Sequence, residues 1–238
     1  GITLADVYSY DRKHNEANGE NNRDGANYNL SWNCGVEGPT KRRKVVELRN
    51  LLMRNAITFV MCAQGIPLIY AGDEFGNSQG GNNNAYCQDN DTGWVDWNAL
   101  NRNHRFYDFV RTMIDFRKHH ACLHMADEAG LTDYKYYGLP DVSYHGVKAW
   151  YPELEHYSRQ AGIMYCGQYA GDENNLYIAF NMHWEPHELA LPNISGRSWQ
   201  AVLTTGTEEL PDASQINEAR TVSVPARTII ILEDEKNS

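Results

Sequence analysis

Two neighbouring carboxylates follow a short apolar run in the first half of the chain. Asp73 and Glu74 come directly after residues 66–72, IPLIYAG, which are apolar on both faces of an extended chain. Such a run is typical of a buried parallel strand, and Pro67 is tolerated near its start. In an α/β barrel the carboxyl ends of the strands form the active-site face. The spacing therefore predicts that both carboxylates lie at a functional surface.

The loop after these carboxylates is dense in side chains that both donate and accept hydrogen bonds. Residues 81–89 read GNNNAYCQD. Asparagine and glutamine amides carry both kinds of group, which suits the hydroxyls of a sugar. Asn, Asp and Gly also favour turns, so the same residues are typical of an ordinary surface loop. Residue chemistry alone leaves these two interpretations open.

Two amphipathic helices are predicted around the apolar run, with long polar loops at residues 11–39 and 73–103. The first helix has Thr40 as its N-cap and stops before Gly65 and Pro67. The second ends in the cations of residues 117–120, where the helix dipole favours positive charge. The first half thus has the order typical of an α/β fold. The apolar residues recur at three- and four-residue spacing: Val45, Leu48, Leu52, Ala56, Phe59 and Ala63, then Phe106, Phe109, Val110, Met113 and Phe116.

The helical period disappears after about residue 121, and short strand patterns separated by turns replace it. Residues 176–182 alternate as expected for a half-exposed antiparallel strand. We therefore expect an antiparallel β-sandwich at residues 123–238, after an α/β part at residues 1–122. The predicted strands are residues 147–151, 163–165, 176–182, 199–203, 222–224 and 228–232.

Composition narrows the classes of partner. The net charge of −10 repels a phosphate backbone and argues against nucleic acid. No run approaches the roughly 20 apolar residues that a membrane span needs, so we expect no membrane partner. The 15 Tyr and 6 Trp side chains are flat and amphipathic, which suits sugars as well as a core. The five widely spaced cysteines indicate reduced thiols and a cytoplasmic protein.

Several specific motifs resemble the debranching branch of the α-amylase superfamily, above all bacterial glycogen debranching enzymes and isoamylases. Together they cover residues 1 to about 120, and the remainder resembles the C-terminal β-domain of that family less specifically. The matching runs are GITLADVYSY at 1–10, KHNEANGE at 13–20, SWNCGVEG at 31–38, AGDEFG at 71–76, NNNAYCQD at 82–89 and WVDW at 94–97.

The resemblance implies that the parent protein is a retaining glycoside hydrolase that cleaves α-1,6 branch linkages in glycogen, starch or limit dextrin. It implies an incomplete C-terminal portion of a (β/α)₈ barrel, with the loop after strand seven, helix seven, strand eight and helix eight, and then the β-sandwich. The family's catalytic carboxylates are expected upstream of Gly1, so the chain alone is expected to be inactive and to self-associate through an exposed barrel face. No cofactor or metal is implied. The resemblance assigns substrate binding to His14, Glu74, Asn83, Asn84, Tyr86 and Asp89.

Two other functions compete with this interpretation. The chain could be a non-catalytic carbohydrate-binding or structural module in its own right. Alternatively, Asp73 and Glu74 could themselves form a catalytic pair, although adjacent residues at a strand end point to opposite faces.

Three local patterns have a plain structural explanation beside a functional one. Residues 89–93 begin like a calcium loop, but the glycine comes one residue early and Leu100 stands where the closing glutamate belongs. The residues His119, His120, Cys122 and His124 match no common zinc spacing and follow a helix C-terminus. Residues 41–44 are four cations in a first helical turn, which favours a solvated face over an anion site.

Overall fold

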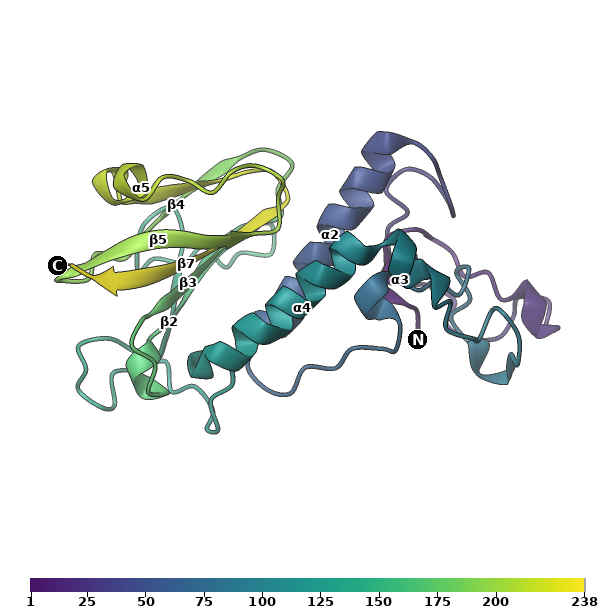
Figure 1. The fold of residues 1–238 in the computed structure, drawn as a ribbon, viewed down its shortest axis with the longest axis horizontal. Coiled ribbons are helices and arrows are strands. Elements are labelled where there is room, and N and C mark those ends of the chain that lie inside the picture. Colours follow the sequence, from purple (N-terminus) through teal and green to yellow (C-terminus); the bar gives the residue numbers. More distant parts are fainter. Residues whose placement is uncertain (238) are drawn as a thin grey trace. The chain divides into compact units, whose positions relative to one another are not determined.

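The computed structural model describes residues 1–237, which form two compact units. The first unit consists of Gly1–Val60 and Pro67–Ile114, and the second of Met61–Ile66 and Asp115–Ser238. Figure 1 shows the elements of both units along the chain. Each unit is described by itself below.

The first unit is built from helices, short turns and long loops. Its two long helices are α2 (Arg43–Cys62) and α4 (His104–His119), each of which gives its last residues to the second unit. Among the described residues, none of the first unit lies in a β-strand. The shorter elements are α1 (Leu4–Val7), η1 (Glu16–Asn18), η2 (Asp73–Phe75), η3 (Ala85–Cys87) and α3 (Asn98–Arg102).

Both predicted amphipathic helices are confirmed, but α2 buries a different side from the one predicted. Phe59 is 41% exposed and Ala63 is also exposed. The buried side chains are instead Met53, Ile57 and Met61, which recur every four residues. The helix therefore has two apolar stripes, and periodicity cannot tell which one packs. Thr40 accepts a hydrogen bond from the Arg42 N–H at 3.2 Å, so its capping oxygen lies just ahead of the helix.

The strand predicted at residues 66–72 is wrong. Residues 66–70 have no regular structure, residues 71–72 form a turn, and Ile66 and Leu68 are 97% and 89% exposed. A strand needs a neighbouring strand to bond its backbone groups. All seven strands of the described chain lie in the second unit, so the first unit offers this segment no partner.

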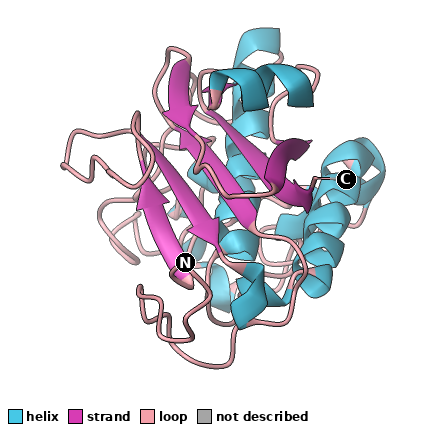
Figure 2. Ribbon diagram, turned by 90° about the vertical axis from the view of Figure 1, so that its left-hand side faces the viewer, coloured by secondary structure: helices cyan, strands magenta, loops and turns pink. Residues whose placement is uncertain are grey.

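The second unit contains a five-stranded antiparallel sheet with the order β1-β2-β3-β7-β5 (Figure 2). A second, two-stranded sheet pairs β4 with β6. A short helix, α5 (Ala213–Ala219), precedes β6, and the turns η4 (Ala121–Leu123) and η5 (Gly167–Tyr169) complete the unit. The strands are β1 (Val142–His145), β2 (Gln160–Tyr165), β3 (Leu176–Asn181), β4 (His187–Ala190), β5 (Arg197–Thr204), β6 (Thr221–Val224) and β7 (Thr228–Lys236).

A single apolar core joins the two sheets, which confirms the predicted β-sandwich. It combines side chains of β2, β3, β5 and β7 with Leu189 of β4, Val222 and Val224 of β6, and Ile216 of α5. The prediction that β3 is half exposed is wrong, because all six of its residues are buried. Strand β3 lies between β2 and β7, and its Tyr177 and Ala179 belong to the core.

Other strand predictions differ in detail. Residues 163–165, 199–203, 222–224 and 228–232 lie within observed strands. Residues 147–151 form a tight turn closed by a Lys148–Tyr151 bridge, and the strand lies just before it, at β1. Strand β4 and helix α5 were not predicted, because both are too short to show a clear period.

One of the cations at the end of α4, Arg117, also donates hydrogen bonds to backbone carbonyls. Arg117 is buried, and its guanidinium donates to the carbonyls of Met61 and Ala63, both at 2.7 Å, and of Gly65 at 2.6 Å. The last carbonyls of a helix have no intrahelical donor. Arg117 therefore satisfies the C-terminal end of α2 and fixes residues 61–66 within the second unit.

Two buried aromatic residues set the packing near β1. The hydroxyl of Tyr177 donates to the Ala190 carbonyl at 2.9 Å, and its ring centroid lies 5.5 Å from that of His145. A Cβ at Gly162 would lie 1.9 Å from the Tyr177 hydroxyl oxygen, so only glycine fits beneath this ring. His145 is fully buried and accepts the Trp150 N–H on Nδ1 at 2.8 Å. Its proton is therefore on Nε2, which donates to the Ser143 hydroxyl at 2.8 Å.

The buried imidazole of His145 makes the stability of the second unit depend on pH. Burial lowers the pKa of His145 from 6.5 to about 4. The unfolded chain therefore takes up this proton below about pH 6.5, whereas the folded protein does so only near pH 4. Between these values we expect the contribution of His145 to the free energy of unfolding to fall by about 3 kcal/mol as pH decreases.

Urea unfolding at pH 7.5 and 4.5 measures this loss, with a His145→Phe variant as the control that lacks the titrating group. The variant should lose less stability on acidification than the unchanged protein does. Equal losses in both proteins, or an NMR titration of His145 with a midpoint near 6.5, would contradict the assignment.

Candidate functional site

The buried carboxylate of Asp6 fixes the loop that carries the predicted sugar contacts. It accepts hydrogen bonds from the Ser78 hydroxyl at 2.5 Å and from the N–H groups of Gln79 at 2.8 Å and Gly81 at 3.2 Å. Asp6 lies in α1, whose first turn is capped by the Thr3 hydroxyl. Gly81 has φ +79°, and a Cβ there would lie 2.7 Å from the Tyr10 ring. The loop therefore crosses α1 and the segment after it closely.

A network of asparagines fastens the next part of this loop to residues 15–29. The amides of Asn15 and Asn83 bond each other, and Asn15 also accepts the Asn83 N–H at 3.0 Å. Asn83 uses its remaining donors on the Ala26 carbonyl and the Asn29 amide oxygen. Asn84 donates to the Asp24 carboxylate at 2.8 Å. These bonds give the loop a fixed conformation without a sheet.

An open hollow of about 500 Å³ lies beside this loop within the first unit. Two tyrosine rings face solvent there, since Tyr70 is 55% and Tyr86 is 87% exposed. Three amides contribute polar groups, and the Gln79 amide donates to the Tyr70 hydroxyl at 3.2 Å. The lining contains no carboxylate. Its residues are Gly1, Ile2, Tyr70, Gln79, Asn84, Ala85, Tyr86, Gln88 and Gly93.

The structure brings two of the six predicted substrate-binding residues into this hollow, Asn84 and Tyr86. Asn83 lies next to them in sequence, but its amide is occupied by the bonds described above. His14 pairs with Glu37 at 3.0 Å outside the lining residues. The assignment of all six to substrate binding stays a prediction.

The remaining two predicted residues also have partners inside the protein. Glu74 accepts the Gly72 N–H at 2.9 Å, and Asp89 accepts the Trp94 indole N–H at 3.0 Å. Tyr70, Gln79 and Gln88 line the hollow and were not predicted as site residues. Gln88 stands in the amide-rich run that was noted, whereas nothing in the local sequence distinguishes Tyr70 from a buried strand residue.

The adjacent carboxylates Asp73 and Glu74 act on the backbone in different ways. Asp73 accepts the Leu4 N–H at 2.8 Å, which holds the first turn of α1. Burial is the largest cause that raises the pKa of Asp73 to about 6, with contributions from the nearby charges of Glu74 and Asp6. Both carboxylates accept hydrogen bonds from backbone N–H groups two or more residues away, and they therefore stabilise the backbone of the first unit.

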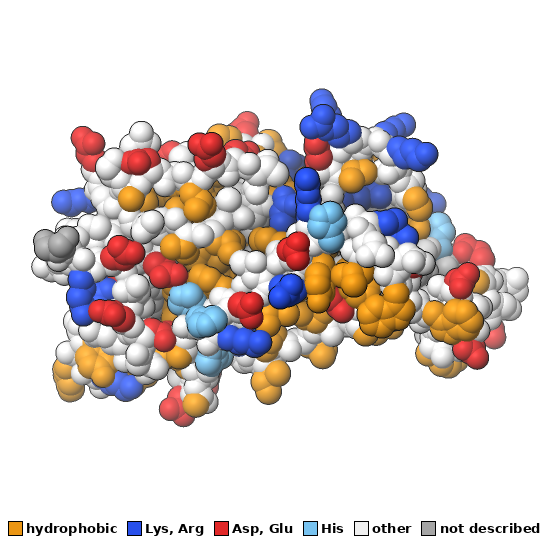
Figure 3. All heavy atoms as spheres, viewed as in Figure 1, with side chains coloured by type: hydrophobic (Ala, Val, Ile, Leu, Met, Phe, Trp, Pro, Cys, Tyr) orange, Lys and Arg blue, Asp and Glu red, His pale blue; other side chains and the backbone are white. Residues whose placement is uncertain are grey.

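The histidines near the end of α4 and the cations of residues 41–44 make contacts that are common in folded proteins. His120 pairs with Glu233 at 3.0 Å, and the Nδ1 atoms of His119 and His120 lie 2.7 Å from carbonyls one helical turn earlier. Within residues 1–237 no group of three His, Cys, Asp or Glu side chains could hold a metal ion. Residues 41–44 are exposed, and Figure 3 shows basic side chains gathered over the beginning of α2. No helix in this part of the chain is long and apolar enough to cross a membrane.

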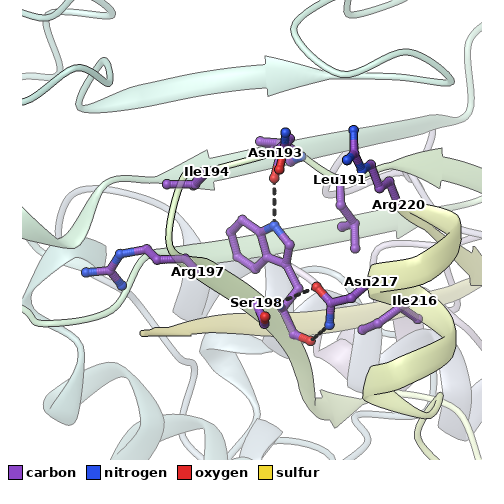
Figure 4. A pocket seen from close by; sticks show the side chains of 10 residues that line it. Leu191, Asn193, Ile194, Arg197, Ser198, Ile216, Asn217 and Arg220 are labelled. Atoms are coloured by element: carbon purple, nitrogen blue, oxygen red, sulfur yellow. Dashed lines mark hydrogen bonds between the residues drawn. The ribbon is translucent and has the colours of Figure 1, made fainter. Parts of the chain in front are cut away.

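A smaller hollow of about 170 Å³ lies in the second unit around Trp199 (Figure 4). The indole N–H donates to the Pro192 carbonyl at 2.8 Å, and the Asn217 amide bonds both the N–H and the carbonyl of Trp199. The guanidinium of Arg197 forms an ion pair with the Asp234 carboxylate at 2.6 Å. These polar groups fasten α5 to β5, so the hollow is part of the fold.

A known protein family matches part of the second unit. Residues 143–230 match the model of the family described as Isoamylase 1-3, C-terminal. Over 89% of its length the chain is 36% identical to isoamylase 1, chloroplastic, of Oryza sativa subsp. japonica. Over 98% of its length it is 36% identical to the glycogen operon protein GlgX homolog of Mycobacterium tuberculosis (strain ATCC 25618 / H37Rv). Residues 143–230 therefore match an isoamylase C-terminal family, and the chain as a whole is similar to part of an isoamylase and of a glycogen operon protein.

The chain spans only part of these relatives, 26% of the rice protein and 34% of the mycobacterial one. A glycogen debranching enzyme of Enterobacter sp. (strain 638) is 50% identical over 101 residues, which are 42% of this chain and 15% of the enzyme. Among solved structures, a pullulanase from Paenibacillus barengoltzii in complex with maltohexaose and α-cyclodextrin has the same fold, with a TM-score of 0.59 and 20% identity. It matches 78% of this chain and 25% of its own.

Replacing the buried carboxylate of Asp6 tests whether it holds the loop. In Asp6→Asn an amide replaces one acceptor oxygen and faces N–H donors, so we expect a loss of about 2–4 kcal/mol in the first unit. Hydrogen exchange at the amides of Gln79 and Gly81 should become faster by a factor of ten or more, on the order of the bond energy lost. The exposed Asp89→Asn is the control. Unchanged protection of both amides in Asp6→Asn would show that the loop is held by other contacts.

Proposed function

We propose that this chain is the glucan-contacting part of an enzyme that cleaves α-1,6 branch linkages in glycogen or starch. The observation that carries the proposal is the hollow of the first unit, which combines two exposed tyrosines with three amide side chains in a chain similar to glycogen debranching enzymes. The names of the relatives support the same substrate, since they include glycogen debranching enzymes and isoamylases.

The chemistry of the hollow suits a neutral sugar chain. Tyrosine rings offer flat faces for the apolar side of a glucose ring, and their hydroxyls remain available to water or to sugar. The amides of Asn84 and Gln79 present groups that both donate and accept. No lysine, arginine or histidine side chain lines the hollow, so an anionic ligand would find no cationic side chain there.

Hydrolysis requires groups that the hollow does not contain. Cleavage of a glycosidic bond uses two carboxyl groups on either side of the bond, about 5–10 Å apart. Asp6, Asp73 and Glu74 bond backbone N–H groups of their own unit, and Asp89 accepts the indole N–H of Trp94. We therefore propose that this chain binds α-glucan and does not hydrolyse it by itself.

The second candidate function is a non-catalytic carbohydrate-binding module. The carboxylate-free hollow favours it for the isolated chain, and it predicts the same binding. The two functions differ in the longer relatives, where the debranching proposal makes Asn84 and Tyr86 affect the turnover of branched glucan and the module does not.

Binding and hydrolysis should be measured on the same preparation of the chain. We expect isothermal titration with maltohexaose to show binding, and Tyr86→Ala to weaken binding at the hollow by about three- to tenfold through the lost stacking face. Reducing-sugar release from glycogen and pullulan should not exceed the background. Tyr28→Ala, another exposed tyrosine, is the matched control.

Two outcomes would contradict the proposal. Wild-type affinity in Tyr86→Ala would remove the hollow as the binding site. Hydrolysis by the chain that disappears in Glu74→Gln would instead establish the pair Asp73 and Glu74 as catalytic.

A further inference from the structure

A folded loop in the second unit displays three tyrosines to solvent. Tyr134, Tyr136 and Tyr137 are 49%, 92% and 45% exposed. They lie between η4 and β1, in a segment without helix or strand. Exposed aromatic side chains that lie close together form an apolar surface in water. Such surfaces mark binding sites when the surrounding structure holds them in place.

Two aspartates give this loop its support. Asp141 is buried and accepts the N–H groups of Gly130 at 2.6 Å and Leu131 at 2.8 Å. Asp133 accepts those of Tyr137 and Gly138, both at 2.8 Å. Each carboxylate closes one bend, so the backbone between residues 130 and 141 is held at two points.

A buried tyrosine forms the base beneath the exposed ones. The Tyr169 hydroxyl donates to Asp133 at 2.8 Å, and its ring centroid lies 4.8 Å from that of Tyr134 and 5.1 Å from that of Tyr137. The ammonium of Lys135 lies 5.4 Å from the centroid of the Tyr169 ring. The two outer rings are therefore fixed before any ligand arrives, which reduces the entropy lost on binding.

The backbone of Tyr136 is in the left-handed conformation, although its exposed side chain makes little contact that would hold it there. Its φ is +59°, in the left-handed region that is costly for an aromatic residue, and its side chain is 92% exposed. The loop thus presents a large apolar face to water in a strained conformation. Such strain persists where the surrounding structure imposes it, and it is concentrated at ligand-binding sites.

A second open hollow, of about 540 Å³, continues from this loop through Leu131. Its lining includes the carboxylates of Asp127 and Glu128 and the ring of Tyr144, which is 37% exposed. Carboxylates accept hydrogen bonds from hydroxyl groups, whereas they repel phosphates and other anions. The hollow together with the tyrosines offers stacking faces beside hydroxyl acceptors.

We propose that the tyrosine loop, residues 126–141, and its adjoining hollow form a second binding site for glucose units of an α-glucan. The ligand is a neutral chain of sugars, because the site joins aromatic faces to acceptor groups and no cationic side chain lines the hollow. The one cation of the loop, Lys135, donates to the Tyr169 carbonyl at 3.3 Å. This inference rests on the proposed function for the nature of the ligand. A polymeric substrate with two attachment points on one protein is held by the effective concentration of the second site.

Titration of the purified chain with maltohexaose tests this site separately from the hollow of the first unit. We expect two molecules bound per chain, and Tyr86→Ala should weaken one of the two by about three- to tenfold and leave the other unchanged. In the Tyr86→Ala background, Tyr136→Ala and Tyr134→Ala should weaken the binding of this other molecule by about three- to tenfold. Tyr151→Ala, 71% exposed on another loop of the second unit, is the matched control and should leave it unchanged. Thermal unfolding of Tyr136→Ala should match that of the parent, because this side chain is almost fully exposed.

The outcomes separate this site from the proposed function. Binding of one maltohexaose that Tyr86→Ala weakens, with no effect of Tyr136→Ala or Tyr134→Ala, would overturn the second site and leave the proposed function in place. Absence of any binding to the unchanged chain would overturn both. A dimer in sedimentation velocity that Tyr136→Ala converts to monomer, without an effect on sugar binding, would identify the loop as an interface between copies and overturn the site.

Discussion

The hydrogen bonds that the buried carboxylate of Asp6 accepts are the constraint on which the first unit depends. This unit has no sheet within the described residues, so the backbone of its long loops must find partners elsewhere. Side chains supply them: Asp6 bonds the N–H groups of residues 79 and 81, while Arg49 donates to the carbonyls of Asn33, Val36 and Gly38. The hollow exists because these bonds hold its loop open in one conformation.

The second unit solves the same problem in the usual way, through strand pairing over an apolar core. Its polar contacts are concentrated where the regular structure ends. Arg117 bonds the Met61 carbonyl in the last turn of α2 and two carbonyls just beyond the helix, and the pair His120 and Glu233 joins the end of α4 to β7. The carboxylates of Asp133 and Asp141 likewise hold the tyrosine loop through hydrogen bonds from its backbone N–H groups. In both units, a loop that we propose to contact sugar is held by carboxylates that accept hydrogen bonds from backbone N–H groups.

The sequence predicted what depends on regular periodicity and missed what depends on partners. The helices α2 and α4, the β-sandwich and most strands follow from their patterns, and the resemblance to debranching enzymes agrees with the relatives found. Residues 66–72 read as a strand because pattern alone cannot show whether a neighbouring strand exists. Asn83 and Asn84 have the same chemistry in sequence, yet only Asn84 lines the hollow. Both the oxygen and the nitrogen of the Asn83 amide bond residues 15–29, whereas Asn84 bonds Asp24 through its nitrogen. Tertiary partners, which no local pattern contains, decide both cases.

A crystal structure of the chain soaked with maltohexaose tests most directly whether the loop held by Asp6 presents a carboxylate-free hollow to α-glucan. We expect glucose rings against Tyr70 and Tyr86, with hydrogen bonds to the amides of Asn84 and Gln79 and no carboxylate within reach of a glycosidic oxygen. Sugar bound with Asp73 and Glu74 on opposite sides of a glycosidic bond, or an empty hollow at saturating ligand, would contradict it.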